Sequence, residues 1–465
     1  MKTDLAIQSF ATHKIGVLGV GVEGLATIDY LLSHGITDIE ALDRNTIANL
    51  PPAIKCTFGD HYMENLERFD VIFRSPGIRP DLPPLATAQK SGTHITSAVS
   101  YFLENCPAKT VAITGTVGKG TASSLTAAGL EACGFTVHLG GNIGKSPLTF
   151  LDDVHPDDIV VLELSSFQTM DISTSPTLAC ILKTTSEHLD WHVDTAEYRR
   201  AKAELLAHPT EDPKTVFNAD SEGAREIALQ AKGPHFSFSL KTVVESGLYL
   251  HNNQFLIREK GADIVLPIEP DRVALAGRFN LENIAAAILN CYLLGGDLQC
   301  ICDTVSRFRG LPHRLELVAE GDNVRYYNDS YATRPDAAEA AISSFSQPLA
   351  LVMGGSEKNA DFSALLSLLL QQKNIASLSL IGATAERMRK ELCSLGTPAF
   401  PVYLKESLEA AMIAGRQSLP NGGVLLMAPA CASFGLFKNY KDRGEQFNTL
   451  AHRLAASSAA SSATI

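Results

Sequence analysis

Two features that would place a protein at or across a membrane are missing from this sequence. No apolar run reaches the roughly 18 residues that a membrane-spanning helix needs. The beginning of the chain has no apolar segment of the kind found in signal peptides. We therefore expect a cytoplasmic protein with no membrane partner.

Positive charge is also scarce. The chain has 39 lysines and arginines against 51 aspartates and glutamates, which gives a net charge of −12 at pH 7. A protein whose main partner is nucleic acid generally carries a basic stripe, and none is present. We expect small-molecule partners rather than nucleic acid, and a monomer.

Clustered cysteines are absent as well. The nine cysteines are scattered, and only Cys300 and Cys302 lie close together in sequence. Their spacing matches neither a zinc site nor a redox pair. The cysteines are therefore expected to be reduced and mostly buried thiols, as in cytoplasmic proteins.

The length and the patterning that are present indicate a globular α/β protein of several domains. A chain of 465 residues with 45% apolar and 19% charged residues is too long for one core. Strand-like and helix-like segments alternate along it without an internal repeat. We place boundaries near residues 107 and 311, which gives domains at 1–107, 108–311 and 312–454. The Ala/Ser-rich tail at 455–465 is expected to be disordered.

A glycine-rich segment, Thr114–Thr121, follows the apolar run at 111–113. Its glycines let backbone N–H groups turn toward an anion, and Lys119 adds a point charge. The helix expected at 122–132 would direct its positive end at the same place. The segment therefore predicts a binding site for the phosphates of a nucleoside triphosphate, with ATP favoured. It is shorter than the pattern G-x-x-x-x-G-K-[ST], and Gly120 follows the lysine, so an ordinary glycine turn is the alternative.

A second glycine-rich segment, Gly19–Gly24, has the pattern G-x-G-x-x-G. It lies between a strand-like run at 14–19 and an expected helix, and Asp43 follows about 20 residues later, as in dinucleotide-binding folds. The pattern fits any doubly wound domain that places a nucleotide or nucleotide-sugar phosphate on its first helix. A further strand-like run ends in the tight turn Arg74–Gly77, which predicts a second ligand-binding edge.

Two polar side chains follow apolar strands in the middle of the chain. Glu163 ends the run at 159–164, and His188 comes shortly after the run at 179–182. Open parallel sheets bind ligands at the carboxyl ends of their strands, so both residues are candidate ligands of a divalent cation. A solvated acid and a structural histidine are the alternatives.

Two helical segments add further candidates. Lys202 lies in the helix expected at 198–206, where an ordinary surface lysine is the alternative. Asn280 and Asn283 are spaced to lie on one helix face, where they could clamp a flat heterocycle or cap the helix.

Taken together, the motifs resemble the Mur ligase family, the ATP-dependent amide ligases of peptidoglycan precursor synthesis, to which folylpolyglutamate synthetases are related. The resemblance extends over essentially the whole chain. It rests on segments 115–119, 141–144, 163–168, 187–190, 198–202, 311–316, 328–333, 354–358, 428–434 and 443–447. It implies a Rossmann-like nucleotide-sugar domain, a central P-loop ATPase-like domain with a parallel sheet, and a C-terminal Rossmann-like domain. It also implies a ligase that joins D-glutamate to UDP-N-acetylmuramoyl-L-alanine through an acyl phosphate, using ATP and Mg²⁺.

The resemblance further implies roles for individual residues. The catalytic residues would be Lys119, His188 and Lys202. The ATP site would comprise Gly115, Thr116, Val117, Gly118, Lys119, Gly120, Thr121, Asn283, His313, Arg314 and Asp329. The UDP-substrate site would comprise Val22, Glu23, Asp43, Ser75, Pro76, Gly77 and Asn142. The acceptor site would comprise Thr333, Lys358, Ser433 and Tyr440. The metal ligands would be Thr121, Glu163, His188 and a carbamylated Lys202.

The chain departs from the family pattern at three positions. Gly120 replaces the hydroxyl residue after the loop lysine, which leaves Thr121 as the candidate Mg²⁺ partner, and Val117 replaces a common asparagine. Tyr331 stands where D-glutamate-adding members usually have lysine, which removes a positive charge near the acceptor. Two alternatives remain: an amide ligase with another acceptor, including folate, and an NAD-dependent oxidoreductase. The second leaves the Lys119 loop, Glu163 and His188 without a role.

Overall fold

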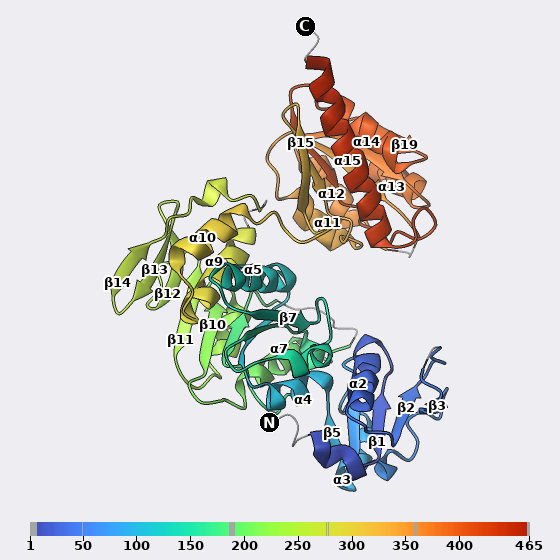
Figure 1. Cartoon of the computed structure of the whole chain (residues 1–465). Helices are drawn as coiled ribbons and strands as arrows, with labels where there is room; N and C mark the ends of the chain where they lie inside the picture. Colours follow the sequence, from blue (N-terminus) through green and yellow to red (C-terminus); the bar gives the residue numbers. More distant parts are fainter. Residues whose placement is uncertain are drawn as a thin grey trace. The chain divides into compact units, whose positions relative to one another are not determined.

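The computed structural model describes residues 7–48, 50–185, 191–275, 277, 279–357 and 360–462. These residues form two compact units (Figure 1). The first runs to Asp271 and includes Leu281–Val305, and the second comprises Arg272–Asn280 and the chain from Ser306 on.

The first unit begins with a sheet of five parallel strands in the order β3-β2-β1-β4-β5. The strands are β1 (Ile15–Leu18), β2 (Ile39–Asp43), β3 (Lys55–Phe58), β4 (Val71–Arg74) and β5 (His94–Thr96). The helices are α2 (Val22–Ser33), α3 (Pro83–Lys90) and α4 (Ala98–Asn105). The strand–turn–helix expected around Gly19–Gly24 is confirmed. A Cβ on Gly24 would lie 2.2 Å from the carbonyl oxygen of Gly19, so the close approach of helix to strand requires glycine there.

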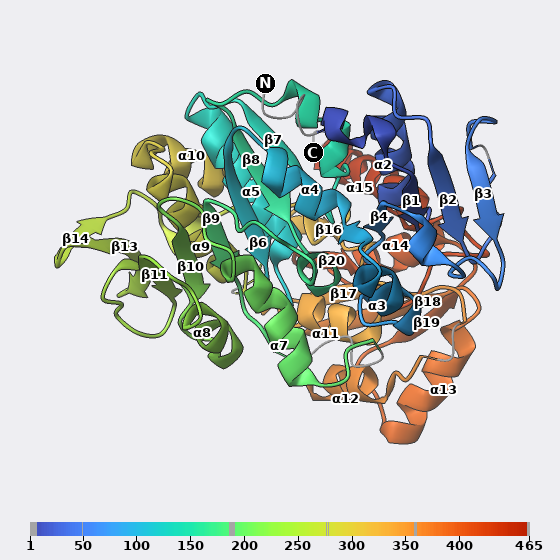
Figure 2. The same cartoon turned by 90° about the horizontal axis from the view of Figure 1, so that it is seen from below.

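The second sheet of this unit has nine strands in the order β14-β13-β12-β11-β10-β9-β6-β8-β7. In sequence order, the first five strands are β6 (Lys109–Thr114), β7 (Val137–Gly141), β8 (Ile159–Glu163), β9 (Leu178–Ile181) and β10 (Lys214–Asn218). The others are β11 (His235–Ser239), β12 (Gly247–His251), β13 (Gln254–Glu259) and β14 (Ala262–Val265). The helices are α5 (Lys119–Ala132), α6 (Ser166–Thr169), α7 (Thr195–Ala203), α8 (Glu222–Ala228), α9 (Asn280–Leu293) and α10 (Leu298–Arg307). Helix α5 packs on β7, β8 and β6, the three strands at one end of the sheet (Figure 2).

The polar, turn-rich sequence of segment 234–269 predicts a small antiparallel insertion with a hairpin turn at Asn252 and Asn253, and the structure confirms this only in part. The hairpin turn at Asn252 and Asn253 is confirmed, and both residues have positive φ angles of 48° and 59°. Strands β12, β13 and β14 are antiparallel to one another, but β11 pairs in parallel with β10, and β12 with β11. The reason is the connection at 240–246, which carries the chain back so that β12 runs in the same direction as β11.

The second unit contains a sheet of six strands in the order β15-β16-β20-β17-β18-β19, in which only β15 is antiparallel. The strands are β15 (Glu316–Gly321), β16 (Val324–Asn328), β17 (Leu349–Gly354), β18 (Ile375–Ile381), β19 (Val402–Lys405) and β20 (Gly423–Met427). The helices are α11 (Pro335–Ile342), α12 (Ser363–Gln371), α13 (Ala385–Leu395), α14 (Leu408–Gln417) and α15 (Tyr440–Ser462). The expected α/β fold is confirmed, whereas the boundaries at 107 and 311 stay predictions.

Helix α15 corrects one expectation from the sequence. It extends to Ser462, so much of the tail from Ala455 on is helical rather than disordered. Phe447 and Ala451 are fully buried and anchor the helix, and alanine, the best helix former, continues it. Among the residues described, none of the helices combines the length and apolar character needed to cross a bilayer.

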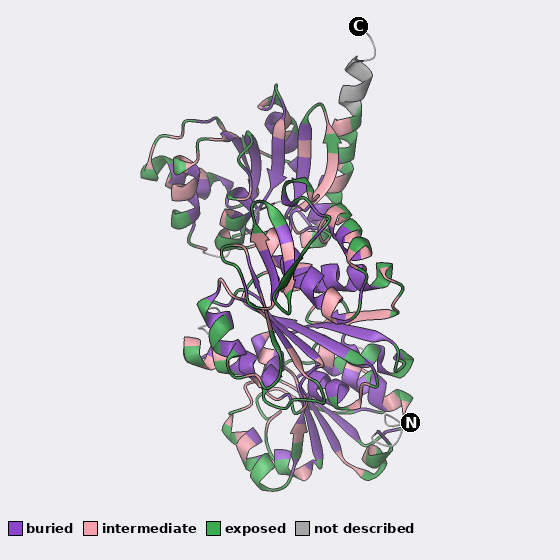
Figure 3. Cartoon of the chain, turned by 90° about the vertical axis from the view of Figure 1, so that its left-hand side faces the viewer, coloured by how far each residue is buried: buried purple, intermediate pink, exposed green. Residues whose placement is uncertain are grey.

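The core of the first unit is continuous between its two sheets. Helix α4 connects them, and its Val99 and Phe102 are fully buried in one cluster with residues of β1, β4 and β8. The ring of Phe102 packs edge-on against that of Phe150, at 5.5 Å between centroids. Figure 3 shows the strands buried and the exposed residues concentrated on helices and loops.

Candidate active site

The phosphate-binding loop predicted at residues 115–121 has the expected strand–turn–helix context. Strand β6 ends at Thr114, Gly118 caps the helix with a φ of 86°, and α5 begins at Lys119. A Cβ on Gly118 would lie 2.1 Å from Oδ1 of Asn283, so the loop presses against α9. The Nζ of Lys119 donates to the carbonyl oxygens of Gly115 (3.0 Å) and Thr116 (2.9 Å). The ammonium group is thus held over the loop, where a phosphate would meet it.

Helix α7 packs directly against this loop. Lys202 is 1% exposed, and its Nζ donates to Oγ1 of Thr114 (3.1 Å) and the carbonyl oxygen of Gly115 (3.0 Å). One turn earlier, the hydroxyl of Tyr198 lies 3.0 Å from Oγ1 of Thr116. The alternative that Lys202 is a surface lysine is wrong, while its carbamylation stays a prediction.

The carboxylate of Glu163 has the properties of a cation ligand. Glu163 ends β8, pairs in register with Ile113 of β6 and is 2% exposed, so the solvated-acid alternative is wrong. Its Oε1 accepts a hydrogen bond from Asn142 (2.9 Å), whereas its buried Oε2 has no partner among the residues described. Burying a carboxylate oxygen without a partner is costly, and a divalent cation would satisfy it. The residues present therefore fit Mg²⁺.

The rest of the predicted metal site is only partly described. His188 lies outside the described residues, and Thr121 occupies the first turn of α5. Within the described ranges, no three His, Cys, Asp or Glu side chains form a group that could hold a metal. The set of metal ligands stays a prediction, of which Glu163 is the part that the geometry favours.

The residues predicted to bind the UDP substrate follow strand ends of the first sheet, except Asn142, which follows β7 of the second sheet and contacts Glu163. A Cβ on Gly19 would lie 2.5 Å from that of Ser75, so the glycine turn and the turn Ser75–Gly77 are adjacent. Asp43 accepts the backbone N–H of Val20 at 2.7 Å and thereby fixes the glycine turn. Val22 is 78% exposed at the start of α2. This edge is open to a ligand.

Two charged residues at this edge are held by the second sheet's domain. Glu23 accepts a hydrogen bond from Nε2 of Gln168, and burial raises the pKa of Glu23. Arg74, 2% exposed, pairs with Asp171 at 2.8 Å. Arg74 is not among the predicted substrate-binding residues, although a charged residue that ends an apolar strand is a signal for such a contact. Both contacts connect the two domains within the first unit.

In the second unit, the segment just before β15, which contains His313 and Arg314, lies beside the segment just after β16, which begins with Asp329. Oδ1 of Asp329 accepts the backbone N–H of Leu315 at 3.0 Å, and burial raises the pKa of Asp329 to about 7. The guanidinium carbon of Arg314 lies 3.9 Å from the ring centroid of Tyr331. His313 has a positive φ of 64°, and its Nδ1 lies 2.9 Å from Nδ2 of Asn328. These two segments bring the guanidinium of Arg314, the carboxyl of Asp329 and the imidazole of His313 to one place.

Predicted acceptor residues surround the same two segments. The rings of Tyr331 and Tyr440 are 5.3 Å apart, while Ser433 is buried and Thr333 half-buried. Lys358 lies outside the described residues. Arg443 is not among the predicted site residues, and it is fully buried. Its guanidinium donates to Oγ (2.9 Å) and the carbonyl oxygen (2.8 Å) of Ser330 and to the carbonyl oxygen of Cys431 (3.1 Å).

The comparisons with known proteins agree with this arrangement. Residues 13–97 match the Mur ligase MurD-like N-terminal domain, 113–291 the Mur ligase middle domain and 313–431 the Mur ligase glutamate ligase domain. The UDP-N-acetylmuramoylalanine–D-glutamate ligase of Clostridium tetani is 32% identical over 451 residues, covering 95% of this chain and 97% of the relative. The enzyme of the same name from Acidobacterium capsulatum is 37% identical over 455 residues, with the same coverage.

Solved structures show the same fold. A MurF ligase from Thermotoga maritima in complex with ADP superposes with a TM-score of 0.58 at 17% identity, covering 97% of each chain. UDP-N-acetylmuramate–alanine ligase MurC from the same organism gives a TM-score of 0.56 at 18% identity, covering 96% of this chain and 100% of MurC.

The fold and the phosphate loop define an ATP-dependent ligase built of three α/β domains. The chain belongs to the Mur ligase family, as the resemblance predicted. Its first domain is of the MurD-like type. The alternative of an NAD-dependent oxidoreductase is therefore wrong.

Proposed function

We propose that this protein joins D-glutamate to UDP-N-acetylmuramoyl-L-alanine, with hydrolysis of ATP, in the cytoplasmic synthesis of peptidoglycan precursors. The two relatives carry the name of this activity and align over nearly their whole length. The structural observation that carries the proposal is the phosphate loop, with Lys119 held over it and the buried Lys202 beneath it. We further propose a monomer whose partners are its small-molecule substrates.

The proposed reaction has two steps. The alanyl carboxylate attacks the γ-phosphorus of ATP, and the bond from that phosphorus to the bridging oxygen breaks. ADP departs as the leaving group, and the alanyl carboxylate becomes an acyl phosphate. The amine of D-glutamate then attacks the carbonyl carbon, loses a proton, and expels phosphate as the amide forms. Lys119 supplies positive charge where negative charge builds up on the transferred phosphoryl group, and the N–H groups of the loop orient that group.

Mg²⁺ fits beside this loop and would neutralise phosphate charge when bound. Thr121, Glu163, His188 and a carbamylated Lys202 would hold it. Carbamylation would convert the buried cation of Lys202 into an anion, which suits a position between a metal and the loop. The support from this chain is the buried Oε2 of Glu163, which has no partner among the described residues.

The remaining residues are proposed to bind the substrates. Asn283 and His313 would border the adenine, and Arg314 and Asp329 would contact phosphate and ribose. The nucleotide-sugar residues would be Val22, Glu23, Asp43, Ser75, Pro76, Gly77 and Asn142. The D-glutamate residues would be Thr333, Lys358, Ser433 and Tyr440.

The test is phosphate release from ATP by the purified protein. UDP-N-acetylmuramoyl-L-alanine and Mg²⁺ are present throughout, and D-glutamate is added or omitted. We expect release that depends on D-glutamate and is accompanied by the amide product in mass spectrometry. L-glutamate, neutral amino acids and a folate acceptor serve as controls. Faster product formation with any of these would assign the chain another acceptor.

A further inference from the structure

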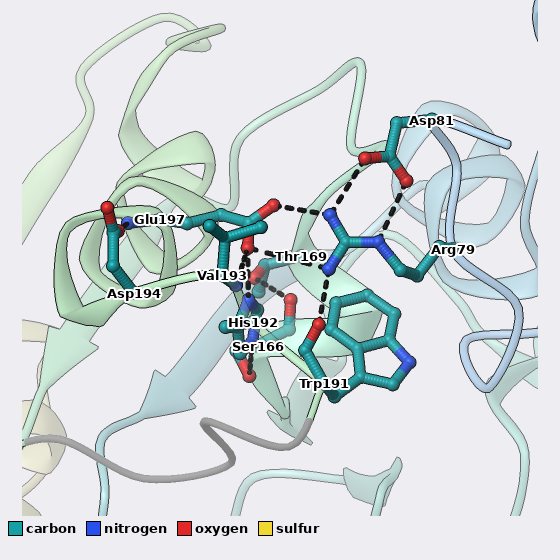
Figure 4. Close-up of polar contacts among 9 residues, drawn as sticks. All are labelled: Arg79, Asp81, Ser166, Thr169, Trp191, His192, Val193, Asp194 and Glu197. Carbon is teal, nitrogen blue, oxygen red and sulfur yellow. Dashed lines mark hydrogen bonds and ion pairs between the residues drawn. The ribbon is translucent and has the colours of Figure 1, made fainter.

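Arg79 lies two residues after Gly77 and connects the first domain to the beginning of α7 (Figure 4). Its Nη2 lies 2.7 Å from Oε1 of Glu197, and its Nη1 donates to the carbonyl oxygen of Trp191. The guanidinium carbon also lies 4.9 Å from the centroid of the Trp191 ring. One side chain thus makes an ion pair, a backbone hydrogen bond and a cation–π contact to a single turn of the neighbouring domain.

Glu197 also contacts the residues just before α7. Its Oε2 accepts the backbone N–H of Val193 at 2.6 Å and lies 3.6 Å from Nδ1 of His192. His192 is 1% exposed, and its Nε2 lies 2.9 Å from Oγ of Ser166, the first residue of α6. The carboxylate is therefore the point where Arg79, the start of α7 and the segment after Glu163 meet.

From Glu197 the contacts continue into the phosphate loop. The next residue, Tyr198, places its hydroxyl 3.0 Å from Oγ1 of Thr116, and Lys202 reaches the carbonyl oxygen of Gly115 one turn later. A shift of the start of α7 would therefore move groups that contact the loop. The turn at Ser75–Gly77 and the phosphate loop are joined by a continuous series of packed polar contacts.

The two carboxylates that pair with Arg79 differ in how far they are exposed to solvent. The side chain of Glu197 is 16% exposed and that of Asp81 is 60% exposed, although each lies within 2.8 Å of the guanidinium. The hydrogen bond from Arg79 lowers the pKa of both carboxyls, so all three groups are charged at neutral pH. Exposed ion pairs contribute little, whereas shielded ones position side chains. Asp81 is therefore a matched control for Glu197.

We propose that Arg79 is a positioning residue that couples binding of the nucleotide-sugar substrate to binding of ATP. The inference rests on the proposed function, in which Ser75–Gly77 contacts that substrate and residues 115–121 hold ATP. Ordering of the turn by substrate orders Arg79, which fixes the start of α7 and, through Tyr198, the phosphate loop. Linkage makes the effect reciprocal: each ligand raises the affinity for the other by the same factor.

The experiment measures this factor by calorimetry. UDP-N-acetylmuramoyl-L-alanine is titrated into the protein with and without a non-hydrolysable ATP analogue and Mg²⁺. For the unmodified chain we expect a ratio of dissociation constants of about five or more, the lower end for allosteric coupling. In Arg79→Gln the ratio falls to about one, while Asp81→Asn and Arg389→Gln, the latter on α13, keep the original ratio. Trp191 is the only tryptophan, so its fluorescence reports loss of the contact directly.

Glu197→Gln alone serves if Arg79→Gln does not fold, which thermal unfolding reveals, and the double variant completes the cycle. The double variant should show the same ratio as each single variant, because both remove one contact. A normal ratio in Arg79→Gln or Glu197→Gln, or a ratio of one in the unmodified chain, overturns the inference. Failure of the unmodified chain to form product with D-glutamate instead overturns the proposed function, so the two failures are distinguishable.

Discussion

The side-chain oxygen of Asn283 occupies the space that a methyl group on Gly118 would need, 2.1 Å from an ideal Cβ position. Asn283 comes from α9, far along the chain from the phosphate loop. The position of this loop is therefore set by contact with a distant helix as well as by its own glycines.

Gly118→Ala is expected to weaken ATP binding by about tenfold or more. The change forces Asn283 away from the loop and adds the roughly 1–2 kcal/mol penalty of a left-handed alanine. Gly134→Ala is the control, because Gly134 has nearly the same φ (88° against 86°) but no described atom within 4 Å of its Cβ position. Isothermal titration with ADP and thermal unfolding compare the two. Equal ADP affinity in both variants would show that the Asn283 contact has no role in nucleotide binding.

Lys202→Ala is expected to be nearly inactive and to regain part of its activity with added formate or acetate. A short carboxylate can enter the space left by the side chain and replace the proposed carbamate anion. Steady-state ligation assays at limiting Mg²⁺ provide the measurement. Lys119→Ala is the control, since it also loses activity but offers no anion site, so the same acids should not restore it. Full activity of Lys202→Ala without additives would exclude any role for this lysine in the reaction.

Lys358→Met is expected to raise the KM for D-glutamate by about ten- to a hundredfold, the effect of losing a charge-assisted hydrogen bond. Tyr331 carries no charge at neutral pH, so acceptor binding should depend heavily on Lys358. Steady-state kinetics with each substrate varied in turn separates this effect from one on ATP. Tyr331→Lys should lower the KM for D-glutamate or leave it unchanged. A defect confined to the KM for ATP would remove Lys358 from the acceptor site.

Asp329 should make the folded chain less stable as the pH rises. Burial raises its pKa from 3.8 to about 7, so the folded state holds a proton that the unfolded state releases between these values. Its contribution to stability is therefore lost as the pH rises from about 4 to 7. Asp329→Asn keeps an acceptor for the N–H of Leu315 and should gain stability relative to the unmodified chain over this range. Thermal unfolding by circular dichroism at several pH values measures the difference.

Asp336→Asn is the control for this pH dependence. Hydrogen bonding from Arg334 lowers the pKa of Asp336, so its contribution has the opposite sign: it is present above its unfolded pKa and lost in acid. The side chain is 63% exposed, so the effect should be small. A stability difference for Asp329→Asn that does not change with pH would contradict the prediction.

Local signals explain which parts of the site could be predicted from the sequence. Glu163 ends an apolar strand, and Lys119 begins the helix that follows another apolar strand and its glycine turn, so both positions are recognisable within a few residues. Lys202 needed the resemblance, because its helix is strongly polar and gives no local sign that the side chain is buried. A motif can indicate that a residue such as Lys202 has a role in the site, but it does not indicate that its side chain is buried.

Contacts between distant segments could not be predicted. Arg74 and Asp171 are 97 residues apart, Arg79 and Glu197 are 118 apart, and both pairs join two domains. A single sequence contains no periodic or spacing signal for such pairs. Arg443 is similar, since its partner Ser330 is 113 residues away. These long-range pairs are the part of the architecture that only the folded structure reveals.

The core shared through α4 has a consequence for cooperativity in the first unit. Val99 and Phe102 belong to the same buried cluster as Val160 and Leu162 of β8, so cutting the chain after residue 107 would expose them to water. A fragment of residues 1–107 alone is expected to be poorly soluble, although its five-stranded sheet is complete. The first two domains are therefore expected to unfold as one cooperative unit, because partial unfolding of either would withdraw support from the other.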